Sequence, residues 1–268
     1  MRVTRVAKRF PLSCDDDRCT LATYSRYERR MTHRYAPLAL SSLLASCGSP
    51  PAPAALASSP PPSAPTAASS PAGAIRIVDG IVSAYLLPID ANQAALVDCG
   101  MDPEATAILE TLATHGLTAD SITAIFVTHL HGDHVGGCER FPNAKLYLAG
   151  ADADPSIVPV TDGQTTTLGS LSVTAYSVPG HTADSIAYLA NGVLYLGDAA
   201  MLSDDGRTVK ASPRRFQGAT HEPDTAKLNV PPLRQLHERL VAQKADVRQL
   251  AFGHSAPLDN PAALANPE

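Results

Sequence analysis

The stretch Thr128-His129-Leu130-His131-Gly132-Asp133-His134-Val135-Gly136-Gly137 decides the fold of this chain. It directly follows an apolar segment, Ile122 to Val127, whose length and composition predict a buried strand. Three histidines and one aspartate fall within six positions. His129 and His131 are two residues apart, so in extended backbone their imidazoles point to the same side. Neutral imidazoles and a carboxylate are the ligands that zinc and similar divalent ions prefer, and the stretch therefore predicts a metal site at the end of a strand.

Three further ligand-type side chains each follow a predicted strand. His181 comes after the segment Leu171 to Val178, and Asp198 comes after Val193 to Leu196. His254 follows the last apolar segment of the chain. Side chains from several strand ends can converge on one edge of a sheet, which is a common way to build a site. This repetition argues against a chance cluster of histidines on a surface loop.

The order HxHxDH, then a single His, an Asp and a final His, resembles the metallo-β-lactamase fold superfamily over about residues 75–260. The resemblance implies an α/β fold, a four-layered αβ/βα sandwich with the site at its edge. Carried over residue by residue, it implies two metal ions, with a first set, a second set and a bridging carboxylate. The first set is His129, His131 and His181, the second is Asp133, His134 and His254, and the bridging residue is Asp198.

The expected cofactor is a pair of zinc ions, with iron or manganese as alternatives. A water molecule that bridges two zinc ions is acidified to hydroxide near neutral pH, while one ion polarises a carbonyl oxygen. The predicted activity is hydrolysis of a small-molecule ester, thioester or lactone by this hydroxide. Asp133 is the expected catalytic residue because it could orient the hydroxide as well as bind metal.

Several functions of the superfamily stay open at this point. Glyoxalase II and quorum-quenching lactonases share all seven ligand positions, although longer forms of glyoxalase II carry a C-terminal helical part and only 14 residues follow His254 here. The commonest class B β-lactamases have Cys where this chain has Asp198, which leaves another β-lactamase subclass as an alternative. An iron persulfide dioxygenase and a non-catalytic metal-binding module are the remaining alternatives.

The pattern from residue 75 onward predicts alternating strands and helices in one domain, residues 75–268. One helix should have Asp102 as its N-cap and end at Gly116, and a second should begin near Pro232. The expected strands are Ile75 to Val78, Ile81 to Ile89, Ala94 to Val97, Ile122 to Val127, Lys145 to Leu148, Leu171 to Val178, Ile186 to Ala190, Val193 to Leu196 and Val247 to Phe252.

Other residues receive simpler interpretations. Asp98 is expected to satisfy a turn rather than to support a ligating histidine, and Cys138 is expected to be a buried inert thiol. Five cysteines are present without the regular spacing of a disulfide framework. The remaining candidates are expected in surface loops or in the core: Arg214, Arg215 and His221 in a loop, and Tyr85, Tyr176, Tyr188 and Tyr195 in packing.

Charge is distributed unevenly along the 268 residues. The first 73 residues hold nine Lys/Arg and four Asp/Glu, which leaves 12 basic and 22 acidic residues in the rest. A surface with this excess of acidic residues repels the phosphate backbone of nucleic acids, which argues against a nucleic-acid partner. No apolar run approaches the roughly 18 residues that a membrane-spanning helix needs.

The N-terminal region predicts a leader and a tether. Residues 48–74 consist of 8 Pro, 9 Ala, 6 Ser, 2 Gly, one Leu and one Thr, so residues 47–74 are expected to form an extended linker. A basic start at Met31, a short apolar segment and the sequence Leu44-Ala-Ser-Cys47 resemble a bacterial lipoprotein signal within residues 1–46. The resemblance implies lipid attachment at Cys47 and a periplasmic location in the cell envelope; without a working signal the protein would be cytoplasmic.

Overall fold

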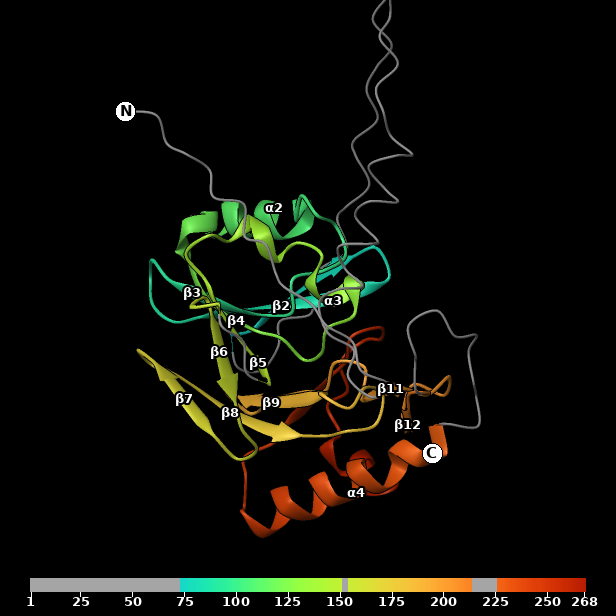
Figure 1. The fold of residues 1–268 in the computed structure, drawn as a ribbon. Helices are drawn as coiled ribbons and strands as arrows, with labels where there is room; N and C mark the ends of the chain where they lie inside the picture. The colour runs from blue at the N-terminus through green and yellow to red at the C-terminus, as the bar shows by residue number, and fades with distance from the viewer. Residues whose placement is uncertain (1–72, 151–153, 214–225) are drawn as a thin grey trace, which may run out of the picture.

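The computed structural model describes residues 73–150, 154–213 and 226–268. Two β-sheets face each other, and helices cover their outer faces (Figure 1). The first sheet has six strands in the order β1 to β6: β1 (Ile75–Asp79), β2 (Val82–Pro88), β3 (Ala94–Val97), β4 (Ile122–Phe126), β5 (Lys145–Ala149) and β6 (Ile157–Val160). Strands β1, β2 and β3 pair antiparallel, whereas β3, β4, β5 and β6 pair parallel.

The second sheet has five strands in the order β13-β10-β9-β8-β7. Only the β10–β13 pair is parallel, and the other three pairs are antiparallel. Its strands are β7 (Thr165–Leu168), β8 (Leu171–Ser177), β9 (Ile186–Ala190), β10 (Val193–Tyr195) and β13 (Gln249–Ala251). A separate pair, β11 (Ala200–Leu202) and β12 (Val209–Ala211), extends beyond the end of β10.

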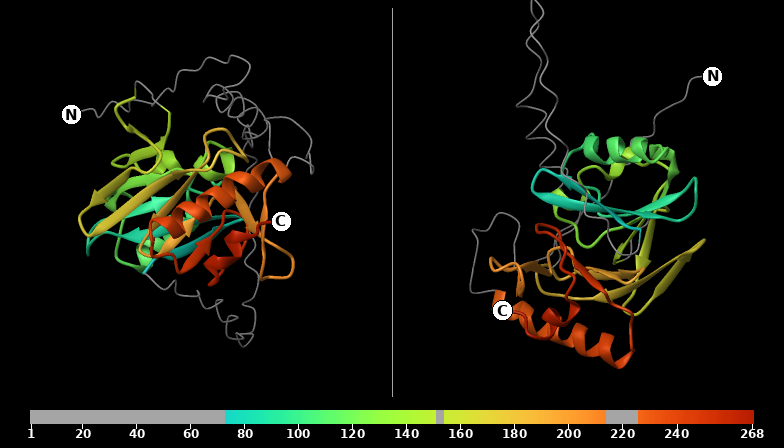
Figure 2. Two further views of the ribbon diagram at one scale, coloured as in Figure 1. Left: turned by 90° about the horizontal axis from the view of Figure 1, so that it is seen from below. Right: turned by 180° about the vertical axis from the view of Figure 1, so that it is seen from behind.

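Three apolar clusters show that the molecule has four layers. Helix α2 (Thr106–Thr114) places Ile108 and Leu112 in a cluster on the outer face of the first sheet. A second cluster fills the space between the sheets and contains Phe126 and Tyr188. The third lies between the second sheet and helix α4 (Ala226–Ala242). The predicted four-layered αβ/βα sandwich is therefore confirmed, and the two further views in Figure 2 show the same arrangement.

The parallel strands position the functional residues. All four residues of β3 are buried, and so are four of the five residues of β4, as expected for strands covered on both faces. Because β3 and β4 run parallel, the residues that follow them emerge at the same edge of the sheet. A short helix, α3 (Gly132–Val135), begins just after β4. The tyrosines expected in packing, Tyr85, Tyr176, Tyr188 and Tyr195, are all buried.

Helix α2 begins later than predicted. Asp102 accepts hydrogen bonds from the backbone N–H of Glu104 and of Thr106, and from the Thr106 hydroxyl. These bonds lower the pKa of Asp102, with the Thr106 hydroxyl as the largest cause. They form a turn ahead of the helix, and Ala105 at its N-cap has φ of 50°. Asp102 therefore organises the approach to the helix and is not its N-cap.

Helix α4 begins earlier than predicted, at Ala226 rather than near Pro232. Pro231 and Pro232 both lie inside it, and each removes one backbone hydrogen bond of the helix. Leu233 and Leu236 pack in the apolar cluster under the second sheet, and this burial offsets the loss. The final strand β13 is shorter than predicted, and β6, β7, β11 and β12 were not predicted.

Some predictions fall outside the described residues. These are the leader in residues 1–46, the linker up to residue 72, lipid attachment at Cys47, and the loop positions Arg214, Arg215 and His221. Within the ranges that the structure does describe, no helix is both long enough and apolar enough to cross a membrane.

Candidate metal centre

The predicted ligand residues all lie just beyond strand ends. His129 and His131 follow β4, and α3 carries Asp133 and His134. In the second sheet, the residues follow three different strands: His181 after β8, Asp198 after β10 and His254 after β13. The structure brings all seven side chains to one edge of the sandwich, where they form two groups of His and Asp that could hold a metal ion.

The first set consists of His129, His131, His181 and Asp198, whose potential ligand atoms all lie within 4.8 Å of one another. Nδ1 of His131 lies 2.9 Å from Nε2 of His129 and 3.1 Å from Nε2 of His181. Three imidazole nitrogens thus face a common point, together with a carboxylate oxygen. Nitrogen and oxygen ligands in this number suit a zinc ion.

The second set consists of Asp133, His134 and His254. Nε2 of His254 lies 3.2 Å from Oδ2 of Asp133. Nε2 of His134 is buried and has no hydrogen-bond partner among the described residues, although Oδ1 of Asp198 lies 3.3 Å away. A buried imidazole nitrogen that faces a carboxylate at this distance fits the position of a cation ligand.

Asp198 joins the two sets. Its Oδ2 atom lies 3.5 Å from Nε2 of His181 and 4.0 Å from Nε2 of His129 in the first set. The same oxygen lies 3.2 Å from Nε2 of His254, while Oδ1 faces His134 in the second set. The position of this carboxylate between the sets is the one that the sequence resemblance implied for a bridging residue.

A second layer of hydrogen bonds orients the imidazole rings. Nδ1 of His181 faces the carbonyl oxygen of Pro213 at 2.8 Å, and Nδ1 of His254 faces that of Ile81 at 2.8 Å. Nδ1 of His129 lies 3.1 Å from the hydroxyl of Thr128. Such outer partners fix the tautomer and the direction of a ligating ring. Sequence reasoning missed all three, because the two backbone carbonyls leave no residue-type signal and the contact of the Thr128 hydroxyl depends on the fold.

Asp98 corrects one of the sequence interpretations. It was expected only to satisfy a turn, but its Oδ2 lies 2.8 Å from Nδ1 of His134. The same carboxylate accepts hydrogen bonds from the backbone N–H and the hydroxyl of Thr128. Asp98 has φ of 57°, a conformation that Asp adopts more readily than most residues. It therefore supports His134 directly and His129 through Thr128.

Burial and neighbouring charges divide the histidines into two groups. Burial, with the repulsion of His134, holds the pKa of His129 well below its usual value, and burial with the repulsion of His181 lowers that of His131 to about 4. Burial opposes protonation of His134 as well, but the charges of Asp98 and Asp198 raise its pKa well above the usual value. Hydrogen bonds to Asp133 and Asp198 raise the pKa of His254 to about 10.

The two carboxylates of the centre are held ionised. Burial disfavours their charge, but His254 lowers the pKa of Asp133, and His134 lowers the pKa of Asp198 well below its usual value. Without a metal ion, the protons on His134 and His254 thus balance the negative charge of the second set. His129 and His131 of the first set, whose pKa values are lowered, present neutral imidazoles, which is the form that binds metal.

Gly197 and Gly253 lie so close to side chains of the centre that a Cβ atom at either position would collide with them. A Cβ atom at Gly253 would lie 2.4 Å from Oδ1 of Asp198 and 2.8 Å from Cε1 of His134. A Cβ at Gly197 would lie 2.4 Å from the hydroxyl oxygen of Thr128, and Gly197 also has φ of 52°. Each glycine precedes a residue of the centre, Asp198 or His254, so the backbone itself forms part of the wall.

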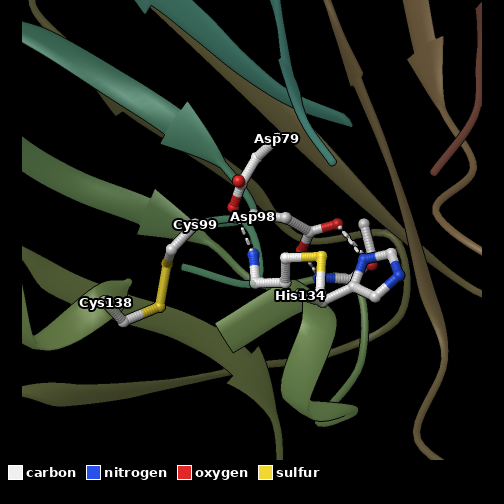
Figure 3. The surroundings of a disulfide bond; sticks show 7 residues. Asp79, Asp98, Cys99, His134 and Cys138 are labelled. Atoms are coloured by element: carbon white, nitrogen blue, oxygen red, sulfur yellow. Dashed lines mark hydrogen bonds and ion pairs between the residues drawn. A yellow bond between two sulfur atoms is a disulfide. The ribbon is translucent and has the colours of Figure 1, made fainter. Parts of the chain in front are cut away.

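A disulfide bond lies near Asp98 and His134, and Figure 3 shows its surroundings. It joins Cys99 and Cys138, which are 39 residues apart in sequence with Cα atoms 5.2 Å apart. The prediction that Cys138 is an inert thiol is therefore wrong. The pairing could not be read from the spacing of the cysteines, because it depends on the fold bringing the end of β3 against the segment after α3.

Comparisons with known proteins agree with this geometry. Residues 77–145 match the family model described as Metallo-beta-lactamase superfamily, a stretch that includes the HxHxDH residues. A Hydroxyacylglutathione hydrolase of Synechococcus sp. is 32% identical over 186 residues, which are 64% of this chain and 67% of that protein. Another Hydroxyacylglutathione hydrolase, from Aeromonas hydrophila, is 35% identical over 134 residues, 48% of this chain and 50% of the relative. The chain thus spans about half the length of that relative.

Solved structures show the same fold. The metallo-beta-lactamase family protein TTHA1429 from Thermus thermophilus has a TM-score of 0.55 and 21% identity, covering 72% of this chain and 77% of that one. The ETHE1 structure from Myxococcus xanthus has a TM-score of 0.51 and 26% identity, covering 68% and 76% of the two chains.

Proposed function

This chain belongs to the metallo-β-lactamase superfamily, and from this premise we propose that it is a metal-dependent hydrolase that cleaves a small-molecule thioester, ester or lactone at the carbonyl carbon. The observation that carries the proposal is the position of Asp198. Its two oxygens face histidines of both sets, so the two sets form one centre rather than two separate metal sites.

Seven residues would hold two zinc ions. The ligands of the first ion are His129, His131 and His181, those of the second are Asp133, His134 and His254, and Asp198 contacts both. When bound, a pair of zinc ions would acidify a water molecule and polarise a carbonyl oxygen. The neutral imidazoles of His129 and His131 and the buried Nε2 of His134, which faces Asp198, support this assignment.

Asp133 is the proposed catalytic residue. Its carboxylate lies at the rim of the centre, is partly exposed, and stays ionised because His254 lowers its pKa. An ionised carboxylate accepts a hydrogen bond from the attacking water molecule and aligns it with the carbonyl carbon. Meanwhile Asp98, Thr128 and the backbone carbonyls behind the histidines keep the rings fixed.

A thioester is the proposed substrate class. The names of the relatives at 32% and 35% identity, Hydroxyacylglutathione hydrolase, support a thioester of glutathione over a lactone or simple ester. In this reaction a bond forms between the water oxygen and the carbonyl carbon, and the carbon–sulfur bond breaks. The products are a carboxylate and a thiol, and the water supplies the thiol proton and one proton to solvent.

Elemental analysis combined with a substrate panel tests the proposal. The metal content of the full chain would be measured as purified. The chain would then be stripped of metal, reloaded with zinc, and assayed on an S-hydroxyacyl glutathione, a lactone, an aryl ester and a β-lactam. We expect two zinc ions per chain and turnover of the thioester. Turnover of the β-lactam alone would assign the protein to that branch, and one iron with dioxygen consumption would assign the dioxygenase branch. A two-zinc protein that hydrolyses none of the four compounds would contradict the proposal.

We further propose that the protein is exported and anchored in the cell envelope by lipid at Cys47. The lipobox sequence Leu44-Ala-Ser-Cys47 and the Pro/Ala/Ser-rich segment after it support this location. The Cys99–Cys138 disulfide gives independent support, because disulfides persist in oxidising compartments outside the cytoplasm. In a bacterial host, Cys47→Ala should move the protein from the membrane fraction to a soluble fraction. Equal membrane association of the variant and the parent chain would contradict the anchor.

A further inference from the structure

The disulfide between Cys99 and Cys138 ties together the two segments that build one metal ligand. Cys99 is fully buried and directly follows Asp98, whose carboxylate holds the ring of His134. Cys138 lies four residues after His134, in the turn that follows α3. One end of the disulfide therefore controls the outer partner of His134, and the other end controls the segment that carries His134 itself.

Backbone hydrogen bonds also join the segment that begins at Cys99 to the segment that carries His134. The N–H of Cys99 donates to the carbonyl of His134 at 2.8 Å, and the N–H of Gly136 donates to the carbonyl of Gly100 at 2.9 Å. A Cβ atom at Gly137 would lie only 2.6 Å from the carbonyl oxygen of Cys99. These segments pack backbone against backbone, so a small separation between them would move His134 away from Asp98.

The first metal set depends on this contact less directly, through Thr128, whose hydroxyl contacts both Asp98 and Nδ1 of His129. His129 and His131 continue from β4, which is paired with β3 on one side and β5 on the other. Backbone hydrogen bonds extend this pairing past the end of β4, from Val127 N–H to the carbonyl of Tyr147. The other members, His181 and Asp198, belong to the second sheet. Loosening of the α3 segment should therefore affect Asp133 and His134 first.

We propose that Cys99 and Cys138 are a redox-sensitive positioning pair for the second metal set. The disulfide holds Asp133 and His134 in the geometry that binds the second ion, and its reduction selectively lowers the affinity of the second set for that ion. This inference rests on the proposed function to the extent that it assumes metal binding by both sets. It makes the occupancy of the second site, and with it hydrolysis, depend on the thiol–disulfide balance around the protein.

The reductant is a dithiol. Reduction breaks the Cys99–Cys138 S–S bond and the two S–H bonds of the dithiol. Two S–H bonds form, one on each cysteine, and one S–S bond forms within the oxidised dithiol. Two electrons and two protons pass to the protein, so the exchange is balanced. Cys138 is the partly exposed member of the pair and Cys99 is fully buried, so Cys138 is the expected point of attack.

The test compares zinc binding by the oxidised and reduced chain. Cys14, Cys19 and Cys47 would first be replaced with Ser, so that Cys99 and Cys138 are the only cysteines left. A trialkylphosphine would reduce the pair, because a dithiol would itself bind zinc. The phosphine is oxidised to the phosphine oxide, whose oxygen atom comes from water. After removal of reagent without air, zinc would be titrated calorimetrically into metal-free protein.

We expect reduction to raise the Kd of the second zinc at least tenfold and that of the first less than threefold. Reoxidation should restore the second Kd, and Cys99→Ser/Cys138→Ser should reproduce the reduced state. Far-ultraviolet circular dichroism would show that the fold is retained, and the reversible reduction keeps the test valid if the double variant fails to fold.

The zinc titrations distinguish a failure of this inference from a failure of the proposed function. An unchanged second Kd, or an equal loss at both sites, would overturn the positioning role while the oxidised protein remains a two-zinc hydrolase. Failure of the oxidised protein to bind zinc would overturn both proposals. Two tight zinc ions without any hydrolysis would contradict the proposed function alone, because the positioning role concerns metal affinity.

Discussion

The carboxylate of Asp98 lies 2.8 Å from Nδ1 of His134, and both side chains are almost fully buried. Asp98 follows β3 and His134 lies on α3, so this contact links two elements that are 36 residues apart at these positions. The bond leaves Nε2 as the only nitrogen of His134 that faces Asp198 and the remaining ligands. A carboxylate behind a ligating imidazole fixes its tautomer and increases its basicity.

Replacing Asp98 with Asn should weaken binding of the second metal ion. Asn keeps the size of the side chain and tolerates the positive φ of this position, so the fold should be retained. The lost negative charge removes one cause of the raised pKa of His134 and makes its imidazole a poorer ligand. We expect about a 10- to 100-fold rise in the Kd of the second zinc, measured by calorimetry.

Asp162→Asn is the matched control for this change. Asp162, in the turn before β7, forms a partly exposed ion pair with Arg239 of helix α4 at 2.9 Å. It is not among the residues of the metal centre, so its removal should leave both zinc affinities unchanged. Equal affinities in Asp98→Asn and in the parent chain would show that His134 needs no carboxylate behind it.

Replacing Asp133 with Asn should abolish most activity without unfolding the chain. Asp133 is partly exposed and contacts His254 at the rim of the centre, so little core packing is lost. A positioned carboxylate that accepts a proton or hydrogen bond typically contributes about 10²- to 10⁴-fold to rate. We expect kcat/KM on the thioester to fall by at least 10²-fold, with unchanged circular dichroism. Asp120→Asn, an exposed change outside the metal centre that affects a contact with Asn143, should keep full activity.

Replacing Gly253 with Ala should disturb the centre by steric contact alone. The added Cβ would lie 2.4 Å from Oδ1 of Asp198, so either the carboxylate or the loop must shift. We expect loss of the second zinc and a fall in activity of at least about tenfold, because a 1 Å displacement of such groups is costly. Gly132→Ala makes the same chemical change where the added atom meets nothing within 4 Å, and it should bind two zinc ions normally. Normal zinc content in both variants would contradict the packing argument.

Zinc binding at the second set should become tighter as the pH rises. In the metal-free chain Asp133 and Asp198 raise the pKa of His254 to about 10, so this imidazole is protonated at neutral pH. A metal ion must displace that proton, and a higher pH lowers the cost. In the first set, the pKa of His131 is lowered to about 4 and that of His129 is well below its usual value, so these two imidazoles are already neutral at pH 7.

Calorimetry in buffers of different ionisation enthalpy would count the released protons. At pH 7 the second zinc should release at least one proton and the first zinc close to none. The second Kd should fall between pH 6 and 9, in the range below the raised pKa of about 10, while the first changes less. Equal proton release at both sites would show that the two sets do not differ in charge.

The sequence by itself determined the strand ends and the residue types placed there. An apolar segment followed by HxHxDH predicts a strand and a ligand-rich loop because both signals are local. The single residues His181, Asp198 and His254 each follow a strand for the same reason. Local hydrophobic pattern and the chemistry of the side chains therefore sufficed for a mixed α and β fold and for the choice of seven candidate ligands, whereas the four-layered architecture was implied by the resemblance to the metallo-β-lactamase superfamily.

Only the tertiary structure decided what stands behind those ligands. The carboxylate of Asp98 reaches His134 because β3 and β4 pair in parallel, and Cys99 meets Cys138 through the same juxtaposition. The carbonyl of Ile81 that faces His254 is a backbone group, 173 residues away in sequence, that any residue type could supply. Contacts of this kind depend on strand register and loop packing, which are set by the folded chain as a whole and leave no local pattern to read.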